Sequence, residues 1–203
     1  MKFLNYFVGL AMVFLFFSCG DNPENKLENN DSSLVEKVKT GNNVVQGARQ
    51  LAAESEALKK LTPIPVETLK AHFPESIFGL PKTNSDGMDM AGLSTAFATY
   101  GHLTNHQINM QVIDGAGEKG AAATGAFRAI KYDQINKENN GDYNKIKEYE
   151  GTIVREDFDK VQNRYTLTFF YNDRFAVKLK ITGFEQKEVW DIFKESKLQD
   201  LKT

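Results

Sequence analysis

The feature that most constrains the fold is a set of short segments in which apolar and polar residues alternate. The clearest are residues 93–100 and 108–113, separated by a turn around Leu103, and residues 164–171 and 174–182. A period of two is typical of a β-strand with one buried face. The last two segments meet in a turn so short that it can join only antiparallel neighbours. We therefore predict an antiparallel sheet.

Apolar residues with helical spacing precede these strands. A capping box that begins at Ser33 predicts a helix from residue 34, and we expect the Gly-Asn-Asn stretch at residues 41–43 to break or kink it. The helical pattern continues over residues 44–61. A proline before residues 66–72 can open a second, short helix there.

The remaining segments complete the order of elements. We predict a helix over residues 121–130, a polar loop over residues 133–144 and a fifth strand over residues 148–155. A second capping box at Thr182 predicts a last helix, in which Trp190 is a core anchor. This order predicts an α+β domain in which an antiparallel sheet of about five strands has helices packed on one face.

The N-terminal segment has the pattern of an exported protein. Lys2 provides a positive charge, and residues 7–17 follow without a charged residue. A stretch of this length is typical of a signal peptide and is too short to span a bilayer as a helix. No later segment approaches the roughly eighteen consecutive apolar residues expected of a transmembrane helix.

The residues that end this segment, Phe16-Phe17-Ser18-Cys19, resemble the lipobox of bacterial lipoproteins, in a Phe-rich form similar to that of Bacteroidetes. The resemblance implies that residues 1–18 are a removable signal peptide. It also implies that the thiol of Cys19 and its new amine carry acyl chains such as palmitate. The resemblance covers only this segment, and the folded domain is not identified as a member of any family. The alternative is an ordinary cleaved signal that leaves a cysteine without lipid.

Lipidation of Cys19 would place the protein in the cell envelope on a polar tether. Each buried CH₂ of an acyl chain contributes about 0.8 kcal/mol, and more than one chain gives stable membrane anchoring. Gly20 stands where an acidic residue retains some lipoproteins in the inner membrane, which favours the outer membrane. The sequence after it is too polar to bury a core. We therefore expect a tether over residues 19–33 and a single domain over residues 34–203.

The charge balance argues against nucleic acid as a partner. The chain has 25 basic and 27 acidic residues and a formal net charge of −2. Domains that bind nucleic acid carry a basic patch or stripe, and none is apparent here. Because the chain has one cysteine, its acylation would also leave the domain without thiol or disulfide chemistry.

Residues 115–120, GAGEKG, match the phosphate-binding string G-x-G-x-x-G between a predicted strand and a predicted helix. The strand before them belongs to a hairpin rather than to a βαβ unit, and the acidic residue that would bind a ribose is missing. We therefore expect no cofactor and interpret the string as a flexible connection. Weak anion binding at the amides of Gly120 and Ala121 is the alternative.

Another group resembles part of a calcium-binding loop. Asn136, Glu138, Asn140 and Gly141 fit the start of an EF-hand, but its twelfth position is Lys147. That position requires a bidentate glutamate, and a lysine would repel the ion. We expect a solvated loop there.

Histidines provide the last candidate for a metal site. His102 and His106 are four residues apart, with His72 and Asp114 as possible further ligands. Zinc requires three or four donors held tetrahedrally, and here the spacing straddles a turn instead of aligning the donors on one helix. We expect no metal site.

Catalytic motifs are also missing. Ser94 lacks the second glycine of a nucleophile elbow. Asp157 and Asp159 flank Phe158 in an expected turn, and paired carboxylates take acid–base roles only where they converge. We assign no catalytic, cofactor or metal residue and expect a binding protein rather than an enzyme.

These features favour a membrane-anchored envelope lipoprotein that acts as a binding or scaffolding module for an envelope protein. The alternative is a carrier of a small apolar ligand or lipid on a sheet face lined by Phe97, Ile108, Met110 and Tyr165. A hydrolase is a third possibility, which a cleft with converging His and carboxylate side chains would identify.

Overall fold

The computed structural model describes residues 31–104, 106–196, 198 and 201. Contacts within the chain divide it into two units, residues 1–40 and residues 41–203. In the first unit the described residues are the start of helix α1 (Asp31–Lys59), whose later residues belong to the second unit. Cys19, the signal segment and the tether as far as residue 30 lie outside the described residues.

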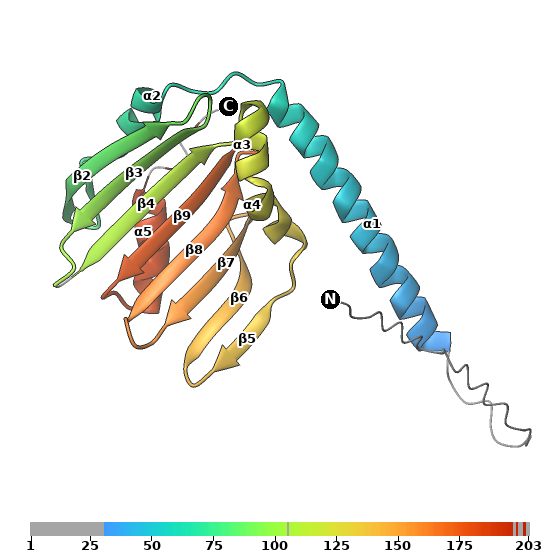
Figure 1. Ribbon diagram of the computed structural model, residues 1–203. Helices are drawn as coiled ribbons and strands as arrows, with labels where there is room; N and C mark the ends of the chain where they lie inside the picture. The colour runs from blue at the N-terminus through green and yellow to red at the C-terminus, as the bar shows by residue number, and fades with distance from the viewer. Residues whose placement is uncertain (1–30, 105, 197, 199–200, 202–203) are drawn as a thin grey trace, which may run out of the picture. The chain divides into compact units, whose positions relative to one another are not determined.

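In the described part of the second unit, nine strands form one sheet in which all neighbours are antiparallel (Figure 1). The strands are β1 (Ser76–Ile77), β2 (Leu80–Asp89), β3 (Ser94–Gly101), β4 (Gln107–Asp114), β5 (Asn136–Asn139), β6 (Asp142–Tyr149), β7 (Thr152–Asp159), β8 (Arg164–Tyr171) and β9 (Phe175–Thr182). Their order in the sheet is β1-β2-β3-β4-β9-β8-β7-β6-β5. The last strand in sequence therefore lies in the middle, between two groups of consecutive hairpins.

Helices cover one face of this sheet much more completely than the other. Helices α2 (Val66–Ala71) and α5 (Val189–Glu195) contribute to the main core, and α5 lies behind the sheet in Figure 1. The short helix η2 (Gln186–Glu188) leads into α5 and has no buried residue. Helices α3 (Gly117–Ala123) and α4 (Gly125–Ala129), followed by η1 (Ile130–Tyr132), pack on the opposite face at one end of the sheet. The prediction that helices pack on one face is therefore wrong.

The covered face contains the main hydrophobic core. Alternate residues of the central strands, such as Met110, Leu179 and Phe169, point to this face and are almost completely buried. Leu69 of α2 and Ile192 of α5 are buried in the same core. Full burial of one such side chain stabilises a fold by about 1.5–3 kcal/mol, so this face supplies most of the hydrophobic stabilisation.

The smaller core lies on the opposite face. Leu58 of α1 and Ala121 of α3 pack against Phe170 and Ala176, with Phe127 at the margin. This contact involves the ends of β4, β8 and β9 that are next to α3 and α4, since Ile113 of β4 also packs there. The rest of that face has no helix packed on it among the described residues.

A buried ion pair joins the segment before α2 to the sheet. Arg174 donates from Nε and Nη2 to the two carboxylate oxygens of Asp114, at 2.8 and 2.9 Å. The carboxylate also accepts hydrogen bonds from the amides of Ile64 and Ala116, and Arg174 donates to the carbonyl of Thr62. The charges are fully paired, which a buried ion pair requires if it is not to destabilise the fold.

The structure confirms the α+β class and the antiparallel sheet, but the sheet is larger than the five strands predicted. The predicted strands at residues 93–100, 108–113, 164–171 and 174–182 are β3, β4, β8 and β9. The strand predicted at residues 148–155 is instead divided by a turn at Glu150 and Gly151, both with positive φ, into the end of β6 and the start of β7.

The polar loop predicted at residues 133–144 is wrong, because most of it forms the hairpin of β5 and β6 around Asn140 and Gly141. Every residue of β5 is exposed, so no apolar alternation marks this strand. β1 and β2 were also not predicted. β2 contains Pro81 and Gly87 and carries few apolar residues, which weakens a strand pattern.

The helix predictions hold in part. α1 continues through residues 41–43, so the expected break is absent. The helix predicted at residues 121–130 begins earlier and is interrupted at Thr124. The last helix starts at η2, with a capping box formed by Glu185 and Glu188 instead of one beginning at Thr182. Trp190 is only partly buried, at the margin of the core.

Candidate functional site

The glycine string at residues 115–120 is a structural connection. Gly115 and Gly120 allow close packing, because a Cβ on either would lie 2.5 Å from a backbone carbonyl oxygen of Arg174 or Asp114, respectively. The amide of Ala116 donates to the side chain of Asp114. Helix α3 is only seven residues long, so its N-terminus is a poor anion site.

The calcium-loop residues do not converge. Asn136 and Glu138 lie on β5, whereas Asn140 and Gly141 form the turn to β6. Glu138 pairs with Lys145 at 2.7 Å, and that ion pair lowers the pKa of the Glu138 carboxyl. The arrangement is a solvated hairpin.

The histidines are also dispersed. His102 and His106 lie exposed in the turn between β3 and β4, where His106 contacts the ring of Phe184, and His72 caps α2. Asp114 is engaged with Arg174. Among the described residues, no group of three or more His, Cys, Asp or Glu side chains could hold a metal ion.

The catalytic candidates are separated in the same way. Ser94 is buried at the start of β3. Asp157 and Asp159 lie within β7, not in a turn, because β7 extends to Asp159. His102 and His106 lie next to β3 and β4, three or more strands away from β7 in the sheet order, and no ion pair joins a histidine to a carboxylate of β7 among the described residues.

The four residues expected to line an apolar site do not share one face. Ile108, Met110 and Tyr165 are buried in the main core beneath α2 and α5. Phe97 pairs with Gln111, and strand alternation places it on the opposite face. That opposite face, not the apolar one, contains a hollow in the described residues.

We call the part of this face not covered by α3 and α4 the open face. Strand pairing arranges its side chains in two adjacent rows across five strands, β3, β4, β9, β8 and β7. One row is Thr99, Asn109, Lys180, Thr166 and Asp157, and the other is Phe97, Gln111, Lys178, Thr168 and Arg155. All but Phe97 are polar, so the open face is a hydrophilic surface on a rigid sheet.

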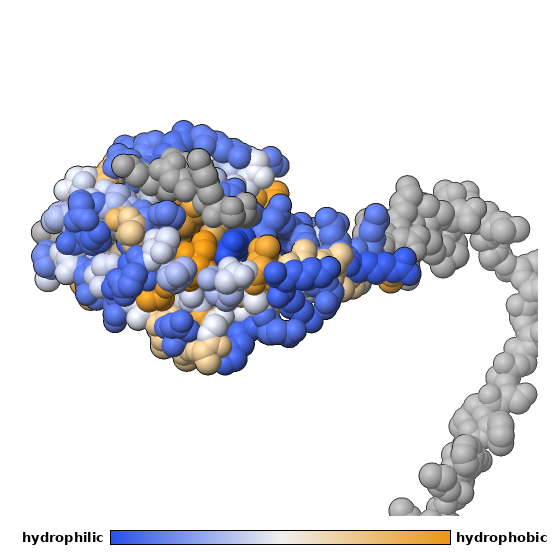
Figure 2. All heavy atoms as spheres, turned by 90° about the horizontal axis from the view of Figure 1, so that it is seen from above, coloured by the Kyte–Doolittle hydropathy of each residue, from blue (hydrophilic) through white to orange (hydrophobic). Residues whose placement is uncertain are grey.

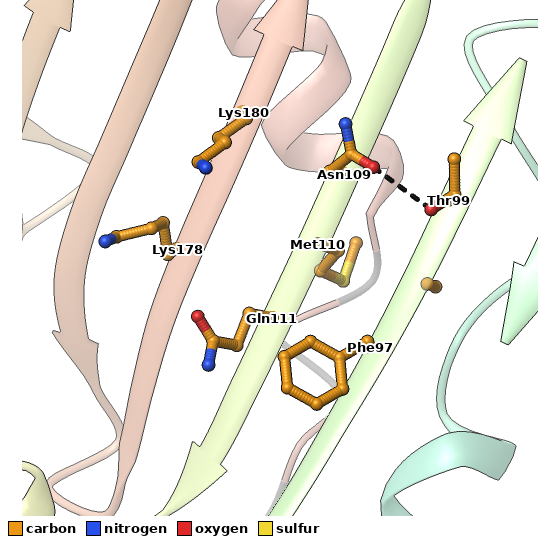
Figure 3. A pocket seen from close by; sticks show the side chains of 8 residues that line it. Phe97, Thr99, Asn109, Met110, Gln111, Lys178 and Lys180 are labelled. Carbon is orange, nitrogen blue, oxygen red and sulfur yellow. Dashed lines mark hydrogen bonds between the residues drawn. The ribbon is translucent and has the colours of Figure 1, made fainter. Parts of the chain in front are cut away.

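A hollow of about 440 Å³ lies over β3, β4 and β9 in this face. It is lined by Phe97, Ala98, Thr99, Asn109, Met110, Gln111, Lys178 and Lys180. Figure 3 shows Phe97 and Gln111 side by side at one end, whereas Lys178 and Lys180 extend from β9 away from β4. Its volume is within the range of about 300–1,000 Å³ that is typical of small-molecule sites.

Hydrogen bonds hold one polar side chain of the hollow in place. The hydroxyl of Thr99 donates to Oδ1 of Asn109 at 3.0 Å, and Nδ2 of Asn109 donates to Oε1 of Gln107 at 2.9 Å (Figure 3 shows the first). Each end of the Asn109 amide therefore keeps one unused donor or acceptor position. A side chain held in this way can bind a ligand without first losing its own rotational freedom.

The charges of the open face are unevenly paired. On β7, Nε of Arg155 lies 3.8 Å from Oδ2 of Asp157. Partial burial raises the pKa of Asp157, and the opposing effects of Arg155, Lys178 and a hydrogen bond from Asn144 are smaller. The ammonium groups of the two lysines of the hollow have no hydrogen bond or ion pair within 4 Å in the described part of the chain.

The most buried acidic group outside the Asp114 pair is Glu156, on the covered face of β7. It accepts hydrogen bonds from the hydroxyls of Tyr143 and Tyr149 and from the ammonium of Lys147. The pKa of both tyrosines is raised, mainly by burial and to a smaller extent by their hydrogen bonds to the negatively charged carboxylate. With three donors the carboxylate is satisfied, and the cluster joins β6 to β7.

Sequence reasoning did not identify the open face. Its signals were Phe97 at the position between Thr95 and Thr99 on one face of β3, and the alternation of Lys178 and Lys180 with buried residues in β9. Both patterns also fit an ordinary solvated face. The hollow becomes visible only when the sheet is assembled and α3 and α4 are seen to cover just one end.

Comparison with known proteins identifies no relative: no family model, no curated protein and no solved structure matches the chain. Within the described residues, no helix has both the length and the apolar character needed to cross a lipid bilayer.

Proposed function

We propose that this protein is a lipid-anchored binding module of the cell envelope, which binds a small polar ligand in the hollow of its open face. The observation that carries the proposal is the hollow itself, a concave site on a rigid sheet with hydrogen-bonding and charged side chains left unused. Sites built on strands hold their side chains more precisely than sites on loops. Helices α2 and α5 pack on the other face of the sheet, and α3 and α4 cover only one end of this face, so the hollow remains accessible.

The membrane anchor is the second part of the proposal, and it rests on the lipobox-like sequence that ends at Cys19. A tethered binding module would keep its ligand close to the membrane surface without spanning the bilayer. Substitution Cys19→Ser should move the protein from the membrane fraction to the soluble fraction and abolish palmitate incorporation. Retention of the variant in membranes would contradict the anchor.

A carrier of an apolar ligand is less well supported. The face lined by Ile108, Met110 and Tyr165 is filled by its own core. Exposed large apolar residues are spread along the described sequence, from Val45 to Val161. On the face seen in Figure 2, hydrophobic atoms gather in small groups among hydrophilic ones. A lipid-binding protein would require a continuous apolar cavity.

Ligand occupancy of the hollow tests the proposal directly. The full-length protein would be extracted from membranes, and its bound small molecules would be measured by native mass spectrometry. Gln111→Trp places a large ring in the hollow, whereas Ile146→Trp places the same ring on β6, on the same side of the sheet but outside the hollow.

We expect wild type and Ile146→Trp to carry a ligand that Gln111→Trp lacks. Equal occupancy in all three proteins would contradict binding in the hollow, as would a wild-type protein that carries no ligand.

A further inference from the structure

We propose that the ligand of the open face is an acidic sugar, a small molecule that carries several hydroxyl groups and a carboxylate, as a uronic acid does. This inference rests on the proposed binding site and names the chemistry of its ligand. Three properties of the hollow support it: the charge, the hydrogen-bonding groups and the single aromatic ring.

The charge of the hollow favours an anion. Lys178 and Lys180 are two residues apart on β9, so their side chains leave the same face about 7 Å apart along the strand. Neither lysine forms an ion pair within 4 Å among the described residues, and the one acidic group of the open face on which Lys178 acts, Asp157, is already 3.8 Å from Arg155. A ligand carboxylate at the β9 side of the hollow, toward which both side chains extend, would gain two charge-assisted contacts.

The neutral side chains favour a ligand with many hydroxyl groups. Asn109 has one unused donor and one unused acceptor, and the amide of Gln111 has no hydrogen bond to another described residue. Thr166 is not part of the lining, but it adds a hydroxyl at the border of the hollow, beside Lys180 in the neighbouring strand. Hydroxyl groups both donate and accept, so a sugar can satisfy these groups at several points, whereas an acyl chain would leave them unpaired.

The apolar part of the hollow is small. Phe97 is its one aromatic residue and is half-buried, and Figure 3 shows its ring beside Gln111. One ring is enough to cover the apolar face of a single sugar. The hydroxyl groups and the carboxylate of that sugar would then point toward Asn109, Gln111 and the two lysines. The dominance of hydrogen-bonding side chains also favours a sugar over a nucleotide, whose flat base would need a larger stacking surface.

Calorimetric titration of the full-length protein in detergent tests the inference. The probes are glucuronate, galacturonate and the galacturonate dimer, with glucose, galactose, inorganic phosphate and adenosine monophosphate for comparison. The variants are Lys178→Gln and Lys180→Gln. Lys137→Gln is the matched control. Lys137 lies on β5 opposite Asn144 of β6, on the same side of the sheet and outside the hollow.

We expect at least one uronate probe to bind and the neutral sugars to bind at least about tenfold more weakly. Each lysine substitution in the hollow should weaken uronate binding about fivefold, the upper range for a partly exposed ion pair. Lys137→Gln should bind like wild type. Equal loss of affinity in all three variants would indicate a general charge effect and overturn the inference.

Tighter binding of the nucleotide, of phosphate or of the neutral sugars than of any uronate would also overturn it, as would no binding of any uronate. The proposed function would survive these results if Gln111→Trp still removed a native ligand that wild type carries. It would fail if occupancy were unchanged by that substitution, so the two failures are distinguishable.

Discussion

Replacement of Arg174 by methionine should destabilise the protein strongly, because it breaks the buried ion pair with Asp114 and leaves the carboxylate without its charge partner. The Asp114 side chain is completely buried, and that of Arg174 is 8 % exposed. Two charge-assisted hydrogen bonds between them and one to Thr62 are lost. Breaking one partner of a buried pair typically costs about 3–5 kcal/mol.

The lower end of that range applies here, because the amides of Ile64 and Ala116 still donate to Asp114 in the variant. A loss of about 3 kcal/mol would shift the urea midpoint by about 1.5 M for an m-value near 2 kcal/mol/M. The melting temperature would fall by about 6–12 °C for a domain of this size. Urea unfolding followed by circular dichroism measures both the midpoint and the m-value.

Arg155→Met is the matched control, since Arg155 is partly exposed on the open face and its ion pair with Asp157 is long, at 3.8 Å. Such a pair contributes about 0–1 kcal/mol. Removal of both charges, in Asp114→Asn with Arg174→Met, should cost clearly less than the sum of the two single substitutions. If Arg174→Met were as stable as Arg155→Met, the ion pair would not have the structural role assigned to it.

Three further substitutions test local features. Tyr100→Phe should leave stability unchanged or raise it by up to about 1 kcal/mol, because this fully buried hydroxyl has no hydrogen-bond partner among the described residues; a clear loss on thermal unfolding would refute this. Asp157→Asn should stabilise the protein at pH 7, because burial raises the pKa of the folded carboxyl; the gain should vanish in acid as that group becomes protonated, and a pH-independent effect would contradict the cause. Gly120→Ala should cost about 1–3 kcal/mol in urea unfolding, because its Cβ would lie 2.5 Å from the Asp114 carbonyl oxygen; a neutral result would mean that the backbone relaxes.

The strands that could be predicted are those whose one face is buried in the main core. β4 alternates between buried and half-buried residues along its whole length, and β8 and β9 carry the same alternation over part of theirs. β5 could not be recognised because every residue in it is exposed, and an exposed strand does not require apolar residues at alternate positions. β2 has only half-buried and exposed residues, so its apolar alternation is weak. It also contains Gly87, where a Cβ would lie close to Val66 of α2, and a glycine inside a strand weakens the pattern further.

The candidate site was less predictable than the fold for a physical reason. A polar residue at every second position of a strand is the normal composition of a solvated face, so Asn109 and Gln111 carry no signal of binding by themselves. The hollow depends on where α3 and α4 end, and neither helix boundary followed from the sequence. The break at Thr124, for example, separates two helices that the apolar pattern had joined.

The most direct test of the central claim, that the open face holds a ligand, is the rate at which individual lysines react with an acetylating reagent. Mass spectrometry would compare protein freshly extracted from membranes with the same protein stripped of small molecules. Lys178 and Lys180 should react more slowly in the extracted protein, while Lys137 on β5 and Lys60 after α1 react equally in both. Equal rates at all four lysines would contradict a ligand on the open face.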